Sequence, residues 1–394
     1  MLIEILLAII IGIILGIFSG ITPGVHVNLI SILLLAISTF LLNYVSAIFL
    51  ASLIVSMAIT HTFLDIIPSV YLGAPDEDKI LNALPGHRKL LQGKAFEAVQ
   101  LSIIGALIGL ISCIIFLPLF LAITLPTYEI IKNYIGWILL ILTIFLILRE
   151  KQRLWCLSLF LISGCLGLVV LNMNVNEGLF PLFSGMFGIA MLISSLKQKI
   201  NIPEQEITNA ECNQKFKAVS CSVVVGWIAS FMPGLGPSQA AAMCSTIVKL
   251  EEDGFVILVG GLSTVNMALS LVSFYLMDKA RNGAIVVVSK IIEITFKDFL
   301  ILTFVALIAG CISAIISLNL AKVFSKLITK VNYRKICIFI IGFILILVII
   351  ICGWIGLFIL IVSTFVGLIP ESKDIPRSHM MGCLLIPVMI YFLL

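Results

Sequence analysis

The sequence has little charge. Only 11% of its 394 residues are Asp, Glu, Lys or Arg, and 61% are hydrophobic, whereas a soluble domain carries about 25% charged residues. A soluble core of this size cannot hide so much apolar surface. The composition therefore excludes a soluble protein and predicts an all-α polytopic membrane protein in contact with membrane lipids. The net charge of +4 indicates no nucleic-acid partner, because basic residues in a membrane protein report its orientation.

The sequence also lacks the motifs of metal and redox chemistry. It contains no CxxC pair and no HExxH motif, and only Cys212 of its ten cysteines lies in a polar stretch. The cysteines are therefore interpreted as small apolar helix residues. An intramembrane metal-dependent enzyme remains an alternative, since four side chains could act as ligands: His26, His61, Asp65 and His379. No cofactor is otherwise indicated.

The N-terminus lacks the positive charge of a secretory signal, because Glu4 stands there and no small-x-small cleavage pattern follows. We expect the first apolar stretch to remain as a membrane helix. A crossing takes about 20 apolar residues, and such stretches recur along the whole chain. Breaks at Pro, Gly and charge clusters divide them into the segments 3–20, 25–42, 44–64, 97–122, 134–149, 154–172, 178–196, 218–232, 237–249, 254–276, 299–320, 336–352, 353–369 and 380–394.

The longest polar run, 197–217, separates two halves of seven segments each, 1–196 and 218–394. The halves share three patterns in the same order, which indicates an internal duplication. The matched patterns are Gly16-x6-Pro23-Gly24 with Gly226-x6-Pro233-Gly234, Ala106–Ile108 with Ala306–Ile308, and Ser163–Gly167 with Ser363–Gly367.

Seven is an odd number, so the second half should enter the membrane from the opposite face and form an inverted repeat. This holds whether the first two segments of each half cross fully or form a re-entrant hairpin at the Pro-Gly motif, because two crossings and none have the same parity. With the linker 197–217 placed in the cytoplasm, most of the 24 Lys and Arg residues fall in inside loops. The N-terminus is then outside. The basic residues that fall outside are Lys132, Lys279, Arg281, Lys290 and Lys297.

The two Pro-Gly breaks, ITPGVHVN at 21–28 and FMPGLGPSQA at 231–240, are the strongest functional signal. Proline and glycine together end one helix and start another, whose free amide groups suit an anion. Matched breaks in inverted repeats mark the midplane site of a transporter. The alternative is a pair of ordinary helix ends near the headgroups. The site candidates at the breaks are Pro23, Gly24, His26, Asn28, Pro233, Gly234, Gly236, Ser238 and Gln239.

Several of these polar residues have a second interpretation. Asn28 or Ser238 could cap a helix, and His26 is either functional or a hydrogen-bonded structural histidine. His61 and Asp65 are four residues apart, so they form a charge or proton pair or mark an interfacial helix end. In the second half the corresponding segment offers Asn266, which we add to the candidate site, and no ionisable residue.

A third break opens the element LPGHRKLLQGKAFEAVQ at 84–100. Its basic residues favour an amphipathic helix on the cytoplasmic surface, close to anionic lipid. Pro85-Gly86 could instead line the inner mouth of a pathway. Near the end of the chain, Glu371, Arg377 and His379 indicate a cytoplasmic loop, from which His379 could reach the interior.

The motifs PGVHVN, PGLGPSQAA and LPGHRKLLQGKAFEA resemble those of the large membrane subunit of tripartite tricarboxylate transporters, the TctA-type subunit. The resemblance covers nearly the whole chain, and it carries over Pro23, Gly24, Pro233, Gly234 and Gly236. It implies ion-coupled uptake of an organic anion, with an extracytoplasmic solute-binding protein and a small membrane subunit as partners. The typical subunit is longer, and it has small residues where His26 and Asn28 stand here.

We therefore expect a permease of the cell membrane that transports a small organic anion of the carboxylate class, coupled to Na⁺ or H⁺. The anion would be held between the half-helix N-termini at the two breaks. A lipid-carrier flippase is the alternative that uses the same architecture. The sequence leaves the substrate, the coupling ion and the oligomeric state open, a homodimer included.

Overall fold

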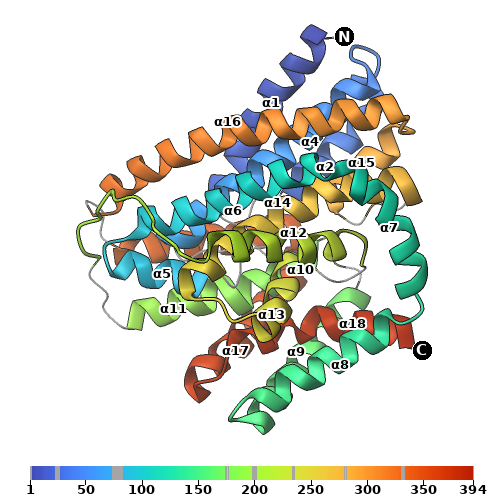
Figure 1. Cartoon of the computed structure of the whole chain (residues 1–394). Coiled ribbons are helices and arrows are strands. Elements are labelled where there is room, and N and C mark those ends of the chain that lie inside the picture. The colour runs from blue at the N-terminus through green and yellow to red at the C-terminus, as the bar shows by residue number, and fades with distance from the viewer. Residues whose placement is uncertain are drawn as a thin grey trace.

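The computed structural model of the chain describes residues 2–22, 27–72, 83–173, 175, 177–197, 202–232, 236–278, 280, 282–329 and 333–393. Every regular element in these ranges is a helix (Figure 1). The helices up to the polar linker are α1 (Leu2–Ile21), α2 (Val27–Ala36), α3 (Ser38–Leu41), α4 (Ala47–Leu64), η1 (Pro68–Leu72), α5 (Ala83–Leu91), α6 (Ala95–Ile115), α7 (Leu117–Ile131), α8 (Ile135–Arg149), α9 (Arg153–Asn172), α10 (Leu179–Phe183), η3 (Ser184–Ile189) and α11 (Ala190–Lys197). Those after it are α12 (Lys215–Phe231), α13 (Pro237–Ile247), α14 (Glu252–Met277), α15 (Gly283–Ile291), α16 (Phe296–Ile328), α17 (Tyr333–Lys373), η4 (Arg377–Met381) and α18 (Gly382–Leu393).

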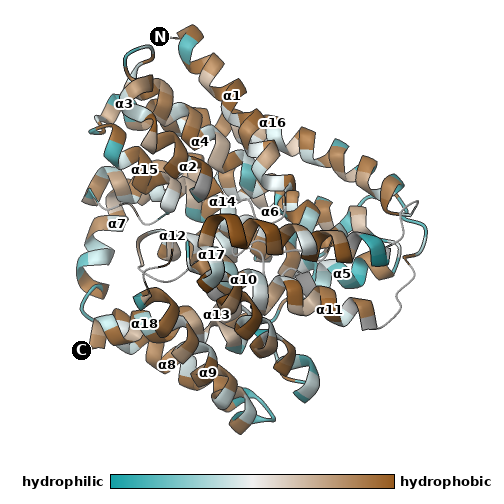
Figure 2. Ribbon diagram, turned by 180° about the vertical axis from the view of Figure 1, so that it is seen from behind, coloured by the Kyte–Doolittle hydropathy of each residue, from teal (hydrophilic) through white to brown (hydrophobic). Residues whose placement is uncertain are grey.

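Within the described part of the chain, seven helices are long and apolar enough to cross a membrane. The number rises to eight if α7 and α8, which meet at an angle of 82°, form one broken span. Figure 2 shows hydrophobic residues over most of the helices, with hydrophilic residues mainly in the connecting segments. The prediction of a polytopic all-α membrane protein is confirmed.

Several predicted segments differ from the helices that form. The segments 25–42 and 237–249 contain α2 and α13, which have only 10 and 11 residues and are too short for a crossing of about 20 residues. The segment 299–320 is too short, because α16 continues to Ile328 and has 33 residues. The boundary predicted between 352 and 353 is confirmed by a break within α17, where Gly353 has a φ of 65°.

The two most enclosed spans are α4 and α14, in each of which 89% of the most apolar stretch is buried, against 33% for α1. Small residues allow their neighbours to approach closely. A Cβ added at Gly12 of α1 would lie 2.5 Å from the Leu53 carbonyl oxygen of α4, and one at Gly105 of α6 would overlap the Ile257 carbonyl oxygen of α14. Small residues at such contacts are typical of helix packing in membranes, and they place α4 and α14 at the centre of the molecule.

A close contact between a glycine and a backbone carbonyl group of another helix also occurs at two further places. A Cβ at Gly167 of α9 would overlap the carbonyl oxygen of Cys383 in α18. A Cβ at Gly367 of α17 would overlap the carbonyl oxygen of Met186 in η3. The two glycines are 200 residues apart, and their partners belong to the last helical segment of each half. Each of these two glycines therefore allows the last helical segment of the other half to approach closely.

The serine four residues before each of these glycines repeats the pattern. Ser163 Oγ donates to the Phe160 carbonyl at 3.0 Å, and Ser363 Oγ donates to the Leu360 carbonyl at 3.1 Å. Both serines are fully buried. Each hydroxyl is satisfied on its own helix, so it can face the crossing without leaving an unpaired polar group.

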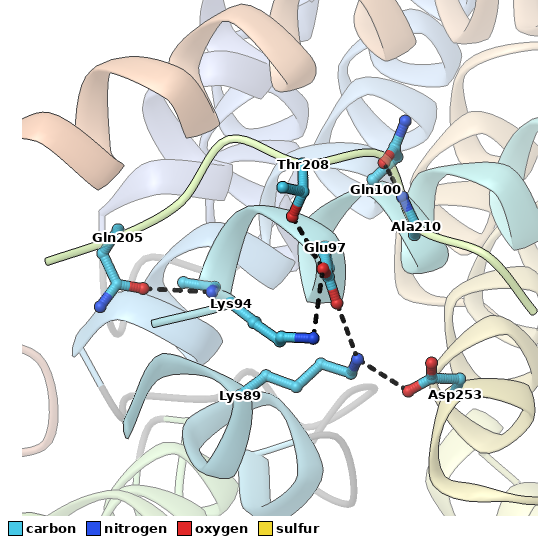
Figure 3. Close-up of polar contacts among 9 residues, drawn as sticks. Lys89, Lys94, Glu97, Gln100, Gln205, Thr208, Ala210 and Asp253 are labelled. Carbon is cyan, nitrogen blue, oxygen red and sulfur yellow. Dashed lines mark hydrogen bonds and ion pairs between the residues drawn. The ribbon is translucent and has the colours of Figure 1, made fainter. Parts of the chain in front are cut away.

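The ten cysteines are all free, as their apolar setting predicts. The described linker residues 202–214 contain no helix, and α12 begins at Lys215. The linker lies along the corner between α5 and α6, where the Gln205 and Thr208 side chains and the Ala210 amide are hydrogen-bonded (Figure 3).

Candidate functional site

The end of α1 packs against the part of α4 that carries His61 and Asp65. Ser19 Oγ lies 3.0 Å from His61 Nδ1, and a Cβ at Gly20 would lie 2.7 Å from Leu64 Cβ. His61 and Asp65 are only 3% and 2% exposed. Both side chains are therefore enclosed by protein beside the end of α1. A helix end exposed at the headgroups would not bury them in this way.

The residues of the first break itself, Pro23, Gly24 and His26, lie outside the described residues, as do Pro233 and Gly234 of the second. The flanking helices frame both positions: α1 ends at Ile21 and α2 begins at Val27, while α12 ends at Phe231 and α13 begins at Pro237. Each position thus separates a longer helix from a short one.

The short helix α13 begins in the way its sequence predicts. Gly236 is the N-cap residue, with extended backbone, and Pro237 occupies the first turn, where a missing N–H breaks no intrahelical hydrogen bond. Ser238 follows and is 1% exposed. Gln239 belongs to the same turn, and its side chain lies outside the described part. The first turn of a helix presents amide groups that have no intrahelical acceptor.

Asn28 occupies the first turn of the other short helix, α2, and faces the start of α15. A Cβ at Gly283 would lie 2.5 Å from Asn28 Oδ1, so only a glycine allows this approach. The preceding residue, Asn282, caps α15 by accepting a hydrogen bond from the Ala284 amide at 3.0 Å. Asn28 is thus placed where the first half meets the second.

Asn266 lies on α14 and is 8% exposed. Its backbone passes close to α12, because a Cβ at Gly226 would lie 2.7 Å from Val265 Cγ1 and 3.5 Å from the Asn266 nitrogen. One turn further along α12, Ser230 Oγ lies 3.4 Å from Ser273 Oγ of α14. The backbone at Asn266 therefore lies close to α12.

The two polar regions meet at one contact. Thr62 Oγ1 of α4 and Thr264 Oγ1 of α14 are 3.0 Å apart, and both side chains are buried. Thr62 follows His61 directly, and Thr264 precedes Asn266 by two residues. The structure thereby brings one hydroxyl of α4 and one of α14 together at the boundary between the halves.

Sequence reasoning missed Thr62 and a second hydroxyl contact nearby. Ser313 Oγ of α16 donates to Thr60 Oγ1 of α4 at 2.9 Å, although their positions are 253 residues apart. Serine and threonine in apolar helices usually bond to their own backbone, so their presence alone does not indicate a partner. Only the packing of α16 on α4 identifies this pair.

The metal-dependent alternative finds no centre in the described residues: no group of three or more His, Cys, Asp or Glu side chains there could hold a metal ion. His379 reaches the interior, where it is 4% exposed, and its Nε2 lies 3.9 Å from Glu150 Oε1 of the α8–α9 connection. Burial lowers the pKa of His379. His26 lies outside the described residues.

The basic residues of α5 face carboxylates. Lys89 Nζ lies 2.9 Å from Asp253 Oδ1 and 3.3 Å from Glu97 Oε2, and the residue is 7% exposed (Figure 3). Arg88 forms an exposed pair with Glu252 at 2.5 Å. The prediction that these side chains lie near lipid is therefore wrong for Lys89. This side chain is buried against the acidic first turn of α14, which belongs to the other half of the chain. Burial acts to lower the Lys89 pKa, but its two carboxylate partners outweigh burial and raise it.

The fold and the buried polar contacts define a polytopic helical membrane protein with interrupted helices around its centre. Comparison with known proteins assigns it more closely. The chain belongs to the tripartite tricarboxylate transporter TctA family, whose model matches residues 6–382. It is 31% identical over 386 residues to the uncharacterized protein MJ1079 of Methanocaldococcus jannaschii, covering 94% of each chain. No solved structure gives a significant match.

Membership confirms the resemblance found in the motifs. The family is one of membrane transporters and not of enzymes, and it implies transport of a carboxylate. The multi-pass location in a membrane follows from the same membership and from the candidate spans.

Proposed function

We propose that this protein is a secondary-active transporter that moves a small organic anion of the carboxylate class across the cytoplasmic membrane. The single observation that carries the proposal is the Thr62–Thr264 contact at 3.0 Å. It joins α4, one residue after His61, to α14, the helix of the second half that carries Asn266. A solute bound there would touch both halves, as alternating access requires.

The proposed binding groups are the N-termini of the short helices α2 and α13. Pro23 and Gly24 precede one, and Pro233 and Gly234 precede the other. Amide groups and the partial positive charge of a helix N-terminus favour a carboxylate. Asn28, Gly236, Ser238 and Gln239 belong to these first turns and would complete the anion site.

Coupling is proposed at His61 and Asp65. A buried carboxylate is costly inside a membrane unless it is neutralised, and Asp65 is 2% exposed. In this proposal H⁺ or Na⁺ binds at this carboxylate and links ion entry to anion binding. The second half has Asn266 in the matching region and no ionisable residue there, so the coupling is asymmetric.

We further propose that residues 1–196 and 218–394 are inverted repeats joined by a cytoplasmic linker, 197–217. The matched crossings at Gly167 and Gly367 support the duplication, and the distribution of Lys and Arg supports an outside N-terminus. The proposed partners are an extracytoplasmic solute-binding protein and a small membrane subunit.

The binding role is tested by Gly24→Leu and Gly234→Leu, with radiolabelled tricarboxylate and dicarboxylate uptake measured in proteoliposomes. We expect each change to abolish uptake and leave membrane insertion intact, because a leucine fills the space that the anion would occupy. Gly342→Leu is the control, since no atom lies within 4 Å of a Cβ at Gly342.

Full uptake by both break variants would refute the role of the breaks. If no carboxylate is taken up by the unaltered protein, but vesicles that contain it expose the labelled phosphate headgroup of a lipid carrier on the far side, the flippase alternative replaces this proposal.

A further inference from the structure

The corner between α5 and α6, residues 88–97, is held by the second half of the chain (Figure 3). Lys89 extends from α5 between two carboxylates, that of Asp253 in the first turn of α14 and that of Glu97 in α6. Lys94 also lies 3.7 Å from Glu97, but its side chain is 47% exposed against 9% for Lys89. Lys89 is therefore the buried link between α5 and α14.

The linker holds the same corner from its outer side. The Gln205 side chain accepts a hydrogen bond from the Ala95 amide at 3.1 Å and donates one to the Leu90 carbonyl at 3.0 Å. The Glu206 amide donates to the Gly93 carbonyl at 2.8 Å. Gly93 has a φ of 80°, and a Cβ there would lie 2.8 Å from the Glu204 carbonyl oxygen, so the close approach requires glycine.

The linker also holds the start of α14. Gln214 Oε1 accepts a hydrogen bond from the Glu251 amide at 3.0 Å, and Lys217 Nζ donates to the Lys249 carbonyl at 2.9 Å. The linker therefore contacts both the helix that carries Lys89 and the start of the helix that carries Asp253.

The helix at the matching place in the second half has no such pair. The bounds of α15, 283–291, are 200 residues later than those of α5, 83–91. Its basic residue, Lys290, is exposed and forms no ion pair with any described residue. Buried apolar side chains, among them Ile285 and Val288, hold α15 instead. Among the described residues, ion pairs therefore hold α5 and not α15.

We propose that Lys89 and Asp253 form a latch that holds α5 against α14 and closes one end of the transport path. The inference rests on the proposed function. Asp253 and Thr264 are on the same helix and 11 residues apart, so the latch lies about 16 Å along α14 from the contact at the centre. That distance is about half the hydrocarbon thickness of roughly 30 Å, which suits a mouth and a midplane site.

The closed and open states of the latch differ in how far water reaches the two charged groups. In the closed state the Lys89 side chain is enclosed while that of Asp253 is 30% exposed, and withdrawing Asp253 without added solvent would leave the buried ammonium group with less compensation. When α5 moves away and the path fills with water, both groups are hydrated and the pair is no longer needed. The latch therefore stabilises the state that is closed at α5 over the state that is open there.

The test measures access to the centre from each side of the membrane. Ser263, beside Thr264 and 1% exposed, is changed to Cys, and a membrane-impermeant maleimide is added to right-side-out and inside-out vesicles without any substrate. In this background the exposed and half-buried cysteines are replaced by Ser. They are Cys165, Cys212, Cys221 and Cys311.

We expect Lys89→Glu to raise the labelling rate about tenfold from the α5 side alone, because it replaces a buried ammonium group with a third carboxylate beside Asp253 and Glu97. Lys89→Arg should keep labelling slow, and Lys89→Glu with Asp253→Lys should restore most of the protection. Arg88→Glu is the matched control, since its pair with Glu252 is exposed and contributes little.

Equal acceleration from both sides would overturn the proposal, because it would mean general loosening of the helices. No acceleration in Lys89→Glu would overturn it as well. Because the labelling uses no anion, its outcome is independent of whether the protein transports a carboxylate.

Discussion

At the scale of single residues, burial separates the polar side chains that lie inside the protein from those on its surface. Asp65 and His61 are enclosed between α1 and α4, and Lys89 is enclosed between α5, α6 and α14. The first pair lies at the centre and the lysine lies at one end of α14. A charge in either place is costly alone, so each must be neutralised by an ion, a proton or a partner.

Asp65→Asn tests the coupling role. We expect the variant to lose ion-driven accumulation of the anion, since an amide binds neither a proton nor a cation as a carboxylate does, while exchange of labelled for unlabelled anion persists. The measurement is uptake against an imposed ion gradient, compared with equilibrium exchange. Glu129→Gln, an exposed carboxylate paired with Lys132, should change neither. Undiminished accumulation by Asp65→Asn would remove Asp65 from the coupling site.

At the scale of elements, short contacts between helices decide the architecture. Glycines let α1 approach α4 and let α6 approach α14, and the matched glycines of α9 and α17 receive the last segment of each half. These contacts involve backbone carbonyl groups, which cannot move aside as a flexible side chain can. Substitution at them should therefore cost more than substitution at a glycine facing open space.

We expect Gly167→Ala and Gly367→Ala to destabilise the protein by similar amounts, about 1–3 kcal/mol each, because each methyl group would overlap a carbonyl oxygen of the partner helix. Gly342→Ala should be neutral or stabilising, by up to about 1 kcal/mol, since alanine is the better helix former and the site is open. Thermal unfolding in detergent measures all three. A large difference between the first two would argue against equivalent halves.

At the scale of the whole molecule, helices of the first half pack against helices of the second, so the halves are not two separate bodies. α4 of the first half packs on α14 and α16 of the second, and α6 packs on α14. The chain connection through the linker is then only one of many links between them. Most of the association comes from buried helix surfaces.

We therefore expect fragments 1–198 and 199–394, expressed together, to assemble and co-purify, and to retain anion uptake in proteoliposomes. The linker residues 204–210 remain joined to the second fragment and can still bind the α5–α6 corner. Co-purification through an affinity tag on one fragment measures this. Fragments that stay apart would show that the covalent link is what holds the halves together.

The sequence by itself determined the membrane class, the family and most of the helix positions, because apolar runs, Pro-Gly breaks and motif order are local properties of the chain. It also pointed to His61, Asp65 and Asn266. Only the tertiary structure decided that Thr62 meets Thr264, that Ser313 reaches Thr60, and that Lys89 faces Asp253 and not lipid. These partners are far apart in the chain and belong to helices with no sequence signal for their neighbours, so packing alone selects them.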